Sequence, residues 1–159
     1  MRNINMIVVH CTASREDSSL TPKDLDIFHR KRGFNGCGYH YYITRDGEIH
    51  AMRPLELAGA HAKGYNAESI GIAYEGGLDV NGQAKDTRTG QQKRSLRVLI
   101  RVLMTDFPVE RVVGHRDLSP DLNGNGVVEP CEWMKMCPCF DVMEEYRGLV
   151  EMMIERRKC

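Results

Sequence analysis

The stretch that decides the fold is Ile4–His10, with the sequence INMIVVH. It is an almost unbroken apolar run, which is typical of a strand buried on both faces in the middle of a sheet. The run ends at His10, so the rigid strand fixes the position and direction of this imidazole. We therefore expect a central strand over residues 4–10, with a candidate functional histidine at its end.

Three helices are indicated by their N-terminal signals. The segment Thr21-Pro22-Lys23-Asp24 offers an N-cap, a proline at the first helical position and an acid in the first turn, and this helix should end at Gly33. Thr89 and Gln92 form a capping box ahead of an amphipathic stripe. Asp141 begins a last helix with its own apolar stripe. Each helix is expected to cover a sheet with its apolar side.

Strand patterns occupy four further segments: Tyr39–Thr44, Glu48–Arg53, Ser69–Tyr74 and Val112–Val113. The first two segments flank Asp46-Gly47, which is a strong hairpin signal. The last segment is followed closely by His115. Residues 78–91 have little apolar content and are predicted to form a surface loop. Interleaved helices and strands with one antiparallel hairpin predict the α/β class. We expect a single domain over residues 1–159, with a central mixed sheet flanked by helices.

The charge balance excludes several classes of partner. Lys+Arg and Asp+Glu number 22 each, so no overall field attracts nucleic acid or an anionic membrane. No apolar stretch is long enough to span a membrane, and residues 1–20 lack a signal-peptide core. We expect a monomer made in the cytosol, where its six cysteines stay reduced. A reduced cysteine is available as a metal-binding thiolate.

Three residues far apart in the chain are candidate ligands of one metal ion: His10, His115 and Cys137. Two imidazoles and one thiolate suit zinc, and three protein ligands leave one coordination position open, as in catalytic zinc sites. For either histidine taken alone, a hydrogen-bonded polar residue at the sheet edge is the simpler interpretation. Cys139 lies two residues from Cys137 and competes with it for the metal.

Seven short motifs occur along the chain in one order: Val9-His10-Cys11-Thr12-Ala13, Gly38-Tyr39-His40-Tyr41, Arg45-Asp46-Gly47, His61-Ala62-Lys63-Gly64-Tyr65-Asn66, Ser69-Ile70-Gly71-Ile72, Gly114-His115-Arg116-Asp117 and Cys137-Pro138-Cys139-Phe140-Asp141. This series resembles the type-2 N-acetylmuramoyl-L-alanine amidases, which include the short phage amidase-lysozymes and the peptidoglycan recognition proteins. The resemblance spans about residues 6–143, which is nearly the whole chain.

The resemblance implies zinc ligands at three matched positions: His10, His115 and Cys137. It places the catalytic tyrosine at Tyr39, a catalytic lysine at Lys135 and a residue of the substrate groove at His61. Enzymes of this kind cut the amide between the lactyl group of N-acetylmuramic acid and the L-alanine of the stem peptide. The match to Lys-x-Cys-Pro favours Cys137 over Cys139 as the thiolate ligand.

The residue types suit this chemistry, because amides are poor electrophiles and water is a poor nucleophile. Zinc activates both, and a lysine ammonium can stabilise the oxyanion that develops. Tyr39 is expected to orient water or to transfer a proton, and the sequence leaves this choice open. Outside the motifs, Tyr39 would be read as an ordinary strand residue and Lys135 as a surface lysine. The remaining histidines are expected to be structural: His29, His40 and His50.

A second metal site is predicted independently. The segment from Asp121 to Glu132 satisfies the EF-hand loop pattern D-x-[DN]-x-[DN]-G-x₅-E. Five residues would supply the oxygen ligands of calcium: Asp121, Asn123, Asn125, Val127 through its backbone carbonyl, and Glu132. The alternative is a plain polar turn, because no helix enters the loop after Ser119-Pro120. Bound calcium would brace the segment between His115 and Cys137.

These observations predict a zinc-dependent hydrolase of bacterial peptidoglycan that resembles an endolysin. The alternatives are a peptidoglycan-binding module of the same fold without activity, and a protein with a merely structural metal site. Peptidoglycan is the expected partner, with no role for nucleic acid or membrane. An enzyme made without a signal peptide would reach the wall when the membrane fails, as in phage or prophage lysis. A role in recycling wall fragments within the cytosol stays open.

Overall fold

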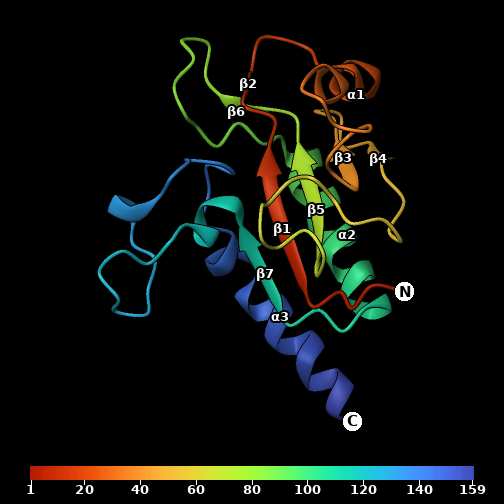
Figure 1. Cartoon of the computed structure of the whole chain (residues 1–159), viewed down its shortest axis with the longest axis vertical. Helices are drawn as coiled ribbons and strands as arrows, with labels where there is room; N and C mark the ends of the chain where they lie inside the picture. The colour runs from red at the N-terminus through yellow and green to blue at the C-terminus, as the bar shows by residue number, and fades with distance from the viewer.

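A five-stranded mixed sheet forms the centre of the computed structural model, which describes residues 1–159 (Figure 1). The strand order is β4-β3-β5-β1-β7. The bounds are Met6–Cys11 for β1, Tyr41–Ile43 for β3, Ile49–Ala51 for β4, Ser69–Tyr74 for β5 and Arg111–Gly114 for β7. All neighbours run parallel except the β3–β4 hairpin, which is antiparallel. The predicted mixed sheet is therefore confirmed.

Strand β1 is central, as the apolar run predicts. Each of its six residues is buried, and it pairs with β5 on one side and β7 on the other. The register sets Val8 beside Gly71 of β5 and Val113 of β7. Because side chains alternate between the faces of a strand, residues two positions further along emerge on the same face. His10 therefore shares a face with Val8, and His115 continues the chain beyond β7 toward that face.

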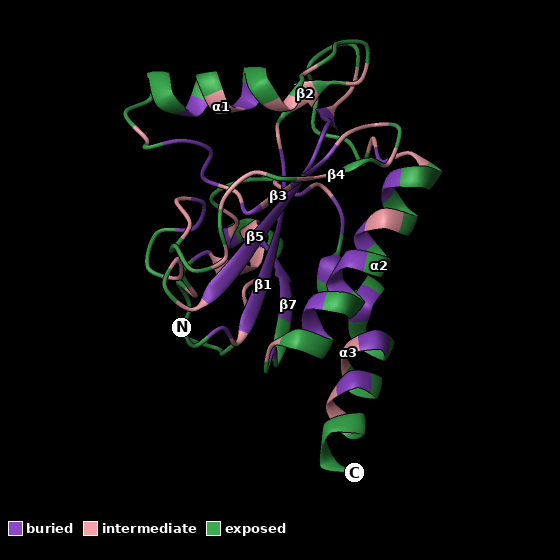
Figure 2. Cartoon of the chain, turned by 90° about the vertical axis from the view of Figure 1, so that its right-hand side faces the viewer, coloured by how far each residue is buried: buried purple, intermediate pink, exposed green.

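The helices are α1 (Pro22–Lys31), α2 (Gly90–Asp106) and α3 (Val142–Lys158). The predicted N-cap at Thr21 is present and forms a capping box with Asp24, and the predicted capping box of Thr89 with Gln92 is present too. Figure 2 shows α2 and α3 together on one side of the sheet, with α1 apart from them. None of the helices combines the length and apolar content needed to cross a bilayer.

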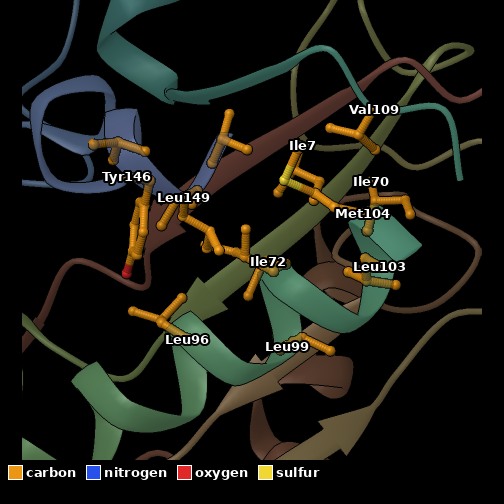
Figure 3. Close-up of a cluster of buried hydrophobic side chains, with 14 of the residues drawn as sticks. Ile7, Ile70, Ile72, Leu96, Leu99, Leu103, Met104, Val109, Tyr146 and Leu149 are labelled. Atoms are coloured by element: carbon orange, nitrogen blue, oxygen red, sulfur yellow. The ribbon is translucent and has the colours of Figure 1, made fainter. Parts of the chain in front are cut away.

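The main core lies between the sheet and the pair α2 and α3. Figure 3 shows side chains of β1 and β5, such as Ile7 and Ile72, directed toward Leu96 of α2 and Leu149 of α3. Burying a side chain of this size contributes about 1.5–3 kcal/mol, so the cluster of 20 buried residues fixes how the helices dock. One face of the sheet is thereby closed to solvent and to ligands.

The opposite face is covered differently. Helix α1 packs Leu25 against Tyr42 and Ala73 near one end of the sheet. Met6, Val8 and Val113 form a smaller cluster under the connecting loops. No long helix lies over the carboxyl ends of β1 and β7, and this is where His10 emerges. The fold therefore leaves room for a cavity above that histidine.

Two local predictions need correction. The strand expected over Tyr39–Thr44 is shorter, because β3 begins at Tyr41 and Tyr39 lies in the segment before it. The backbone there approaches Ala60 so closely that a Cβ on Gly38 would lie 2.3 Å from the Ala60 carbonyl oxygen. The predicted surface loop over 78–91 begins inside β6 (Gly77–Leu78), which pairs with β2 (Ser14–Arg15).

Candidate metal centre

The three candidate ligands meet at the carboxyl ends of β1 and β7. His10 lies near the end of β1, His115 directly follows β7, and Cys137 comes from the segment before α3. The available donor atoms of the three side chains all lie within 4.8 Å of one another. The His10 Nδ1 and Cys137 Sγ atoms are 3.9 Å apart, and the two imidazole rings have centroids 4.6 Å apart.

This donor set fits zinc. Bond lengths of about 2.1 Å to nitrogen and 2.3 Å to sulfur place tetrahedral donors roughly 3.4–3.6 Å apart, and the 3.9 Å between His10 Nδ1 and Cys137 Sγ is near that range. Both imidazoles are held neutral: burial and the charge of Lys135 lower the pKa of His115 to about 4, and burial lowers the pKa of His10 well below its ordinary value. A neutral imidazole offers the lone pair that a metal needs.

Backbone contacts fix the position of Cys137. The backbone N–H of Cys11 donates to Cys137 Sγ at 3.3 Å. The Arg116 N–H donates to the Cys137 carbonyl at 2.9 Å and ties this segment to the turn after β7. Cys139, the competing thiol, instead lies 3.4 Å from the Gly77 carbonyl oxygen. The structure therefore brings Cys137 to the histidines, and all six cysteines are free.

His61 lies behind the cluster in direct contact with His10. Its Nδ1 atom is 2.9 Å from His10 Nε2, and the two rings are nearly perpendicular at 89°. Burial is the largest cause that lowers the pKa of His61, to about 3. The family resemblance predicts a place for His61 in the substrate groove but not this contact, because nothing in the motifs relates residues 51 positions apart. The structure places it both in the cavity wall and beside the candidate ligand.

A cavity of about 660 Å³ opens above the cluster. Its wall includes every residue assigned to zinc, catalysis or the groove: His10, Tyr39, His61, His115, Lys135 and Cys137. Arg32 and Phe34 also line it, and no sequence motif points to either of them. No aspartate or glutamate lines the cavity. The wall therefore has a positive character, to which Lys63 also contributes.

The two predicted catalytic residues flank the cluster. The Tyr39 ring centroid is 5.0 Å from that of His10, and burial raises the pKa of its hydroxyl, which keeps the neutral form. Lys135 is exposed on the cavity wall, and its positive charge contributes to lowering the pKa of both His10 and His115. A hydroxyl donor and an ammonium group thus share one cavity with the candidate ligands.

The other histidines make hydrogen bonds within the fold, as expected, and His29 also lines the cavity. His29 Nδ1 accepts the Gly38 N–H at 2.8 Å. His40 Nδ1 accepts the Gly71 N–H at 3.0 Å, and its Nε2 lies 2.9 Å from the Leu57 carbonyl oxygen, to which it can donate. His50 sits in the β3–β4 hairpin at 3.3 Å from the Thr44 hydroxyl. None of the three belongs to the metal cluster.

The predicted calcium loop folds as a compact turn outside the candidate metal cluster. The Asp121 carboxylate accepts N–H groups of Gly124 and Gly126, both at 2.7 Å. One Glu132 oxygen accepts the Leu122 N–H at 2.7 Å, which closes the loop. The amide oxygens of Asn123 and Asn125 accept backbone N–H groups two residues onward, the second of them from Val127. These bonds use the side-chain oxygens that are predicted to bind calcium, and calcium binding stays a prediction.

The fold and the cluster together define a class: a mixed α/β protein with a candidate three-ligand metal centre on the floor of an open cavity. Residues 1–138 match the sequence profile of the N-acetylmuramoyl-L-alanine amidase family. The chain therefore belongs to that family, as the motifs predict.

Individual relatives agree with this assignment. The endolysin of Klebsiella phage KP32 is 30% identical, over 87% of this chain and 82% of the endolysin. The solved structure of the N-acetylmuramoyl-L-alanine amidase LysC from Clostridium intestinale is 35% identical, with a TM-score of 0.72 over 94% of this chain and 87% of LysC. Drosophila PGRP-LB, at 21% identity and a TM-score of 0.66 over 93% of this chain and 82% of its own, shares the fold.

Proposed function

We propose that this amidase cuts the bond between N-acetylmuramic acid and the L-alanine of the stem peptide, with zinc held by His10, His115 and Cys137. The observation that carries the proposal is the convergence of these donors within 4.8 Å on the floor of an open cavity. The related endolysins and LysC support the reaction. Because the thiolate ligand and both catalytic residues are retained at the cavity, hydrolysis is favoured over binding alone.

When bound, zinc supplies a Lewis acid that activates water and polarises the amide carbonyl. The chain's own residues complete the chemistry. The Lys135 ammonium faces the same cavity and donates to the oxyanion that develops on the carbonyl oxygen. Since burial favours the neutral hydroxyl of Tyr39, this residue donates a hydrogen bond and orients the reacting groups. No carboxylate in the cavity wall competes for these roles.

The wall of the cavity also suits the substrate. Stem peptides carry free carboxylates, and the wall offers Arg32 and Lys63 with no acidic residue beside them. Phe34 and Tyr65 offer apolar faces for the sugar and for peptide side chains. His61 reaches the same wall, in keeping with its predicted place in the groove. All three zinc ligands come from one chain, so we propose that a monomer is active.

The endolysin relatives also suggest where the protein acts. We propose that it degrades the wall from the inner side once the membrane fails, in phage or prophage lysis. The test is expression in a bacterial host with and without a separate membrane-permeabilising agent. Lysis is expected only with both. Lysis by the protein alone would contradict this route.

Mass analysis of purified peptidoglycan after incubation tests the reaction itself. The expected products are intact stem peptides with a free L-alanine amine and glycan strands without new reducing ends. New reducing ends would identify a glycosidase and overturn the proposal. The matched control is the same incubation with metal-free protein, which should release no peptides.

The calcium prediction has a separate test. If Asp121, Asn123, Asn125 and Glu132 bind calcium, adding it to calcium-free protein should raise the melting temperature by mass action, because only the folded loop binds. The control is Asp121→Asn with Glu132→Gln, in which this shift should vanish. Equal melting temperatures with and without calcium would leave the plain turn as the correct interpretation.

A further inference from the structure

A chain of hydrogen bonds runs from the candidate ligand His10 into the protein interior. His10 Nε2 lies 2.9 Å from His61 Nδ1, and His61 Nε2 lies 3.3 Å from the Ser69 hydroxyl. The Ser69 hydroxyl in turn donates to the Tyr65 carbonyl oxygen at 2.7 Å. His10 and Ser69 are almost fully buried and His61 is 9% exposed, so bulk water does not replace these partners.

The last member of the chain sets the direction of every bond. A carbonyl oxygen can only accept, so the single proton of the Ser69 hydroxyl points to Tyr65. The Ser69 oxygen then accepts from His61 Nε2–H. A neutral imidazole carries one N–H, so His61 Nδ1 is left as an acceptor and receives the Nε2–H of His10. His10 Nδ1 consequently keeps its lone pair, on the side that faces Cys137 at 3.9 Å.

The backbone is shaped to hold the His61 ring in this place. A Cβ on Gly71 would lie 2.5 Å from His61 Cδ2, and a Cβ on Gly59 would lie 2.4 Å from the same atom. Glycine inside a strand weakens it, and here it marks the close approach of the ring to β5. The Asn66 side-chain oxygen accepts the N–H groups of His61 and Ala62, both at 2.9 Å, and fixes the loop.

We propose that His61 is a positioning residue, which with Ser69 holds His10 as the Nε2–H tautomer so that Nδ1 is free for the metal. This inference rests on the proposed zinc site and adds a role for His61 that a groove residue would not have. Outer partners of this kind commonly orient metal-binding histidines, and losing one typically costs about 10–100-fold in metal affinity. Here a neutral histidine takes the place that a carboxylate or carbonyl often fills.

The test combines three variants with two readouts. His61→Leu removes the acceptor, and His61→Asn keeps a side-chain oxygen that can accept from His10. Ser69→Ala removes the acceptor of the His61 Nε2–H bond. Ser69 does not line the cavity, so a lost substrate contact cannot explain its effect. The readouts are the His10 tautomer in metal-free protein, from long-range proton–nitrogen correlation spectra, and zinc affinity, from competition with a chelator.

Wild-type protein should show His10 protonated at Nε2. His61→Leu should populate the Nδ1–H form and bind zinc about 10–100-fold more weakly, with Ser69→Ala changed in the same direction and His61→Asn close to wild type. A wild-type Nδ1–H tautomer, or unchanged zinc affinity in both His61→Leu and Ser69→Ala, would overturn the inference. Equal losses in His61→Asn and His61→Leu would also overturn it, because packing alone would then account for them.

Failure here is distinguishable from failure of the proposed function. If Cys137→Ser loses zinc while the His61 and Ser69 variants keep it, only the positioning role is wrong. If Cys137→Ser also keeps its zinc, the ligand set itself is wrong. The tautomer is read without metal, so it gives an independent answer in either case.

Discussion

Replacing Cys137 with serine is expected to remove most of the bound zinc and to lower turnover at least about 100-fold, more than the loss of a partner outside the ligand set costs. A serine hydroxyl stays protonated near neutral pH and is a poor zinc ligand, whereas a cysteine binds zinc as its thiolate. The measurements are zinc content after gel filtration and the rate of stem-peptide release.

Cys139→Ser is the matched control for this prediction. Its sulfur lies 3.4 Å from the Gly77 carbonyl oxygen and does not belong to the donor cluster. This variant should keep zinc and activity. A Cys137→Ser protein with full activity and full zinc would remove Cys137 from the ligand set, and loss of zinc in Cys139→Ser instead would transfer the role to that residue.

Lys135→Ala should keep its zinc and yet turn over about 10²–10³-fold more slowly, the usual cost of losing one donor to a developing oxyanion. Lys135 lines the cavity without belonging to the donor cluster, so metal content and KM should change little. The measurements are kcat, KM and zinc content on one preparation.

Lys135→Arg is the control that separates charge from packing. It keeps a cation on the same exposed segment and should recover part of the lost turnover. A kcat for Lys135→Ala equal to that of wild type would show that the oxyanion is stabilised elsewhere. A large rise in KM with kcat unchanged would instead assign Lys135 to substrate binding.

Local signals predicted the elements of the fold well. The apolar run over residues 4–10 predicts the central strand, and the structure buries all of Met6–Cys11. The N-cap at Thr21 and the capping box at Thr89 predict helix starts because they satisfy specific backbone N–H groups, and both are present. Strand ends were less predictable, because the start of β3 depends on contacts made by Gly38 with the distant Ala60.

The sequence predicts which residues form the site, but it does not predict which of them are in contact. The motif series predicts His10, His115 and Cys137 as ligands. It does not predict the register between β1 and β7, which sets Val8 beside Val113 and so brings the two histidines together. The bond between His10 and His61 depends on the same pairing, because the ring fits above Gly71 of the neighbouring strand. The alternation of side chains along a strand predicts the sheet face on which each residue lies, but it does not predict which residues meet across strands.

Zinc-edge X-ray absorption on the purified protein tests the central claim most directly. The account predicts one sulfur neighbour at about 2.3 Å and nitrogen or oxygen neighbours at about 2.0–2.1 Å, with two imidazoles and one exchangeable oxygen. That spectrum would match His10, His115 and Cys137 around a centre with an open position. A second sulfur, no sulfur, or a fourth protein ligand in place of the exchangeable oxygen would contradict it.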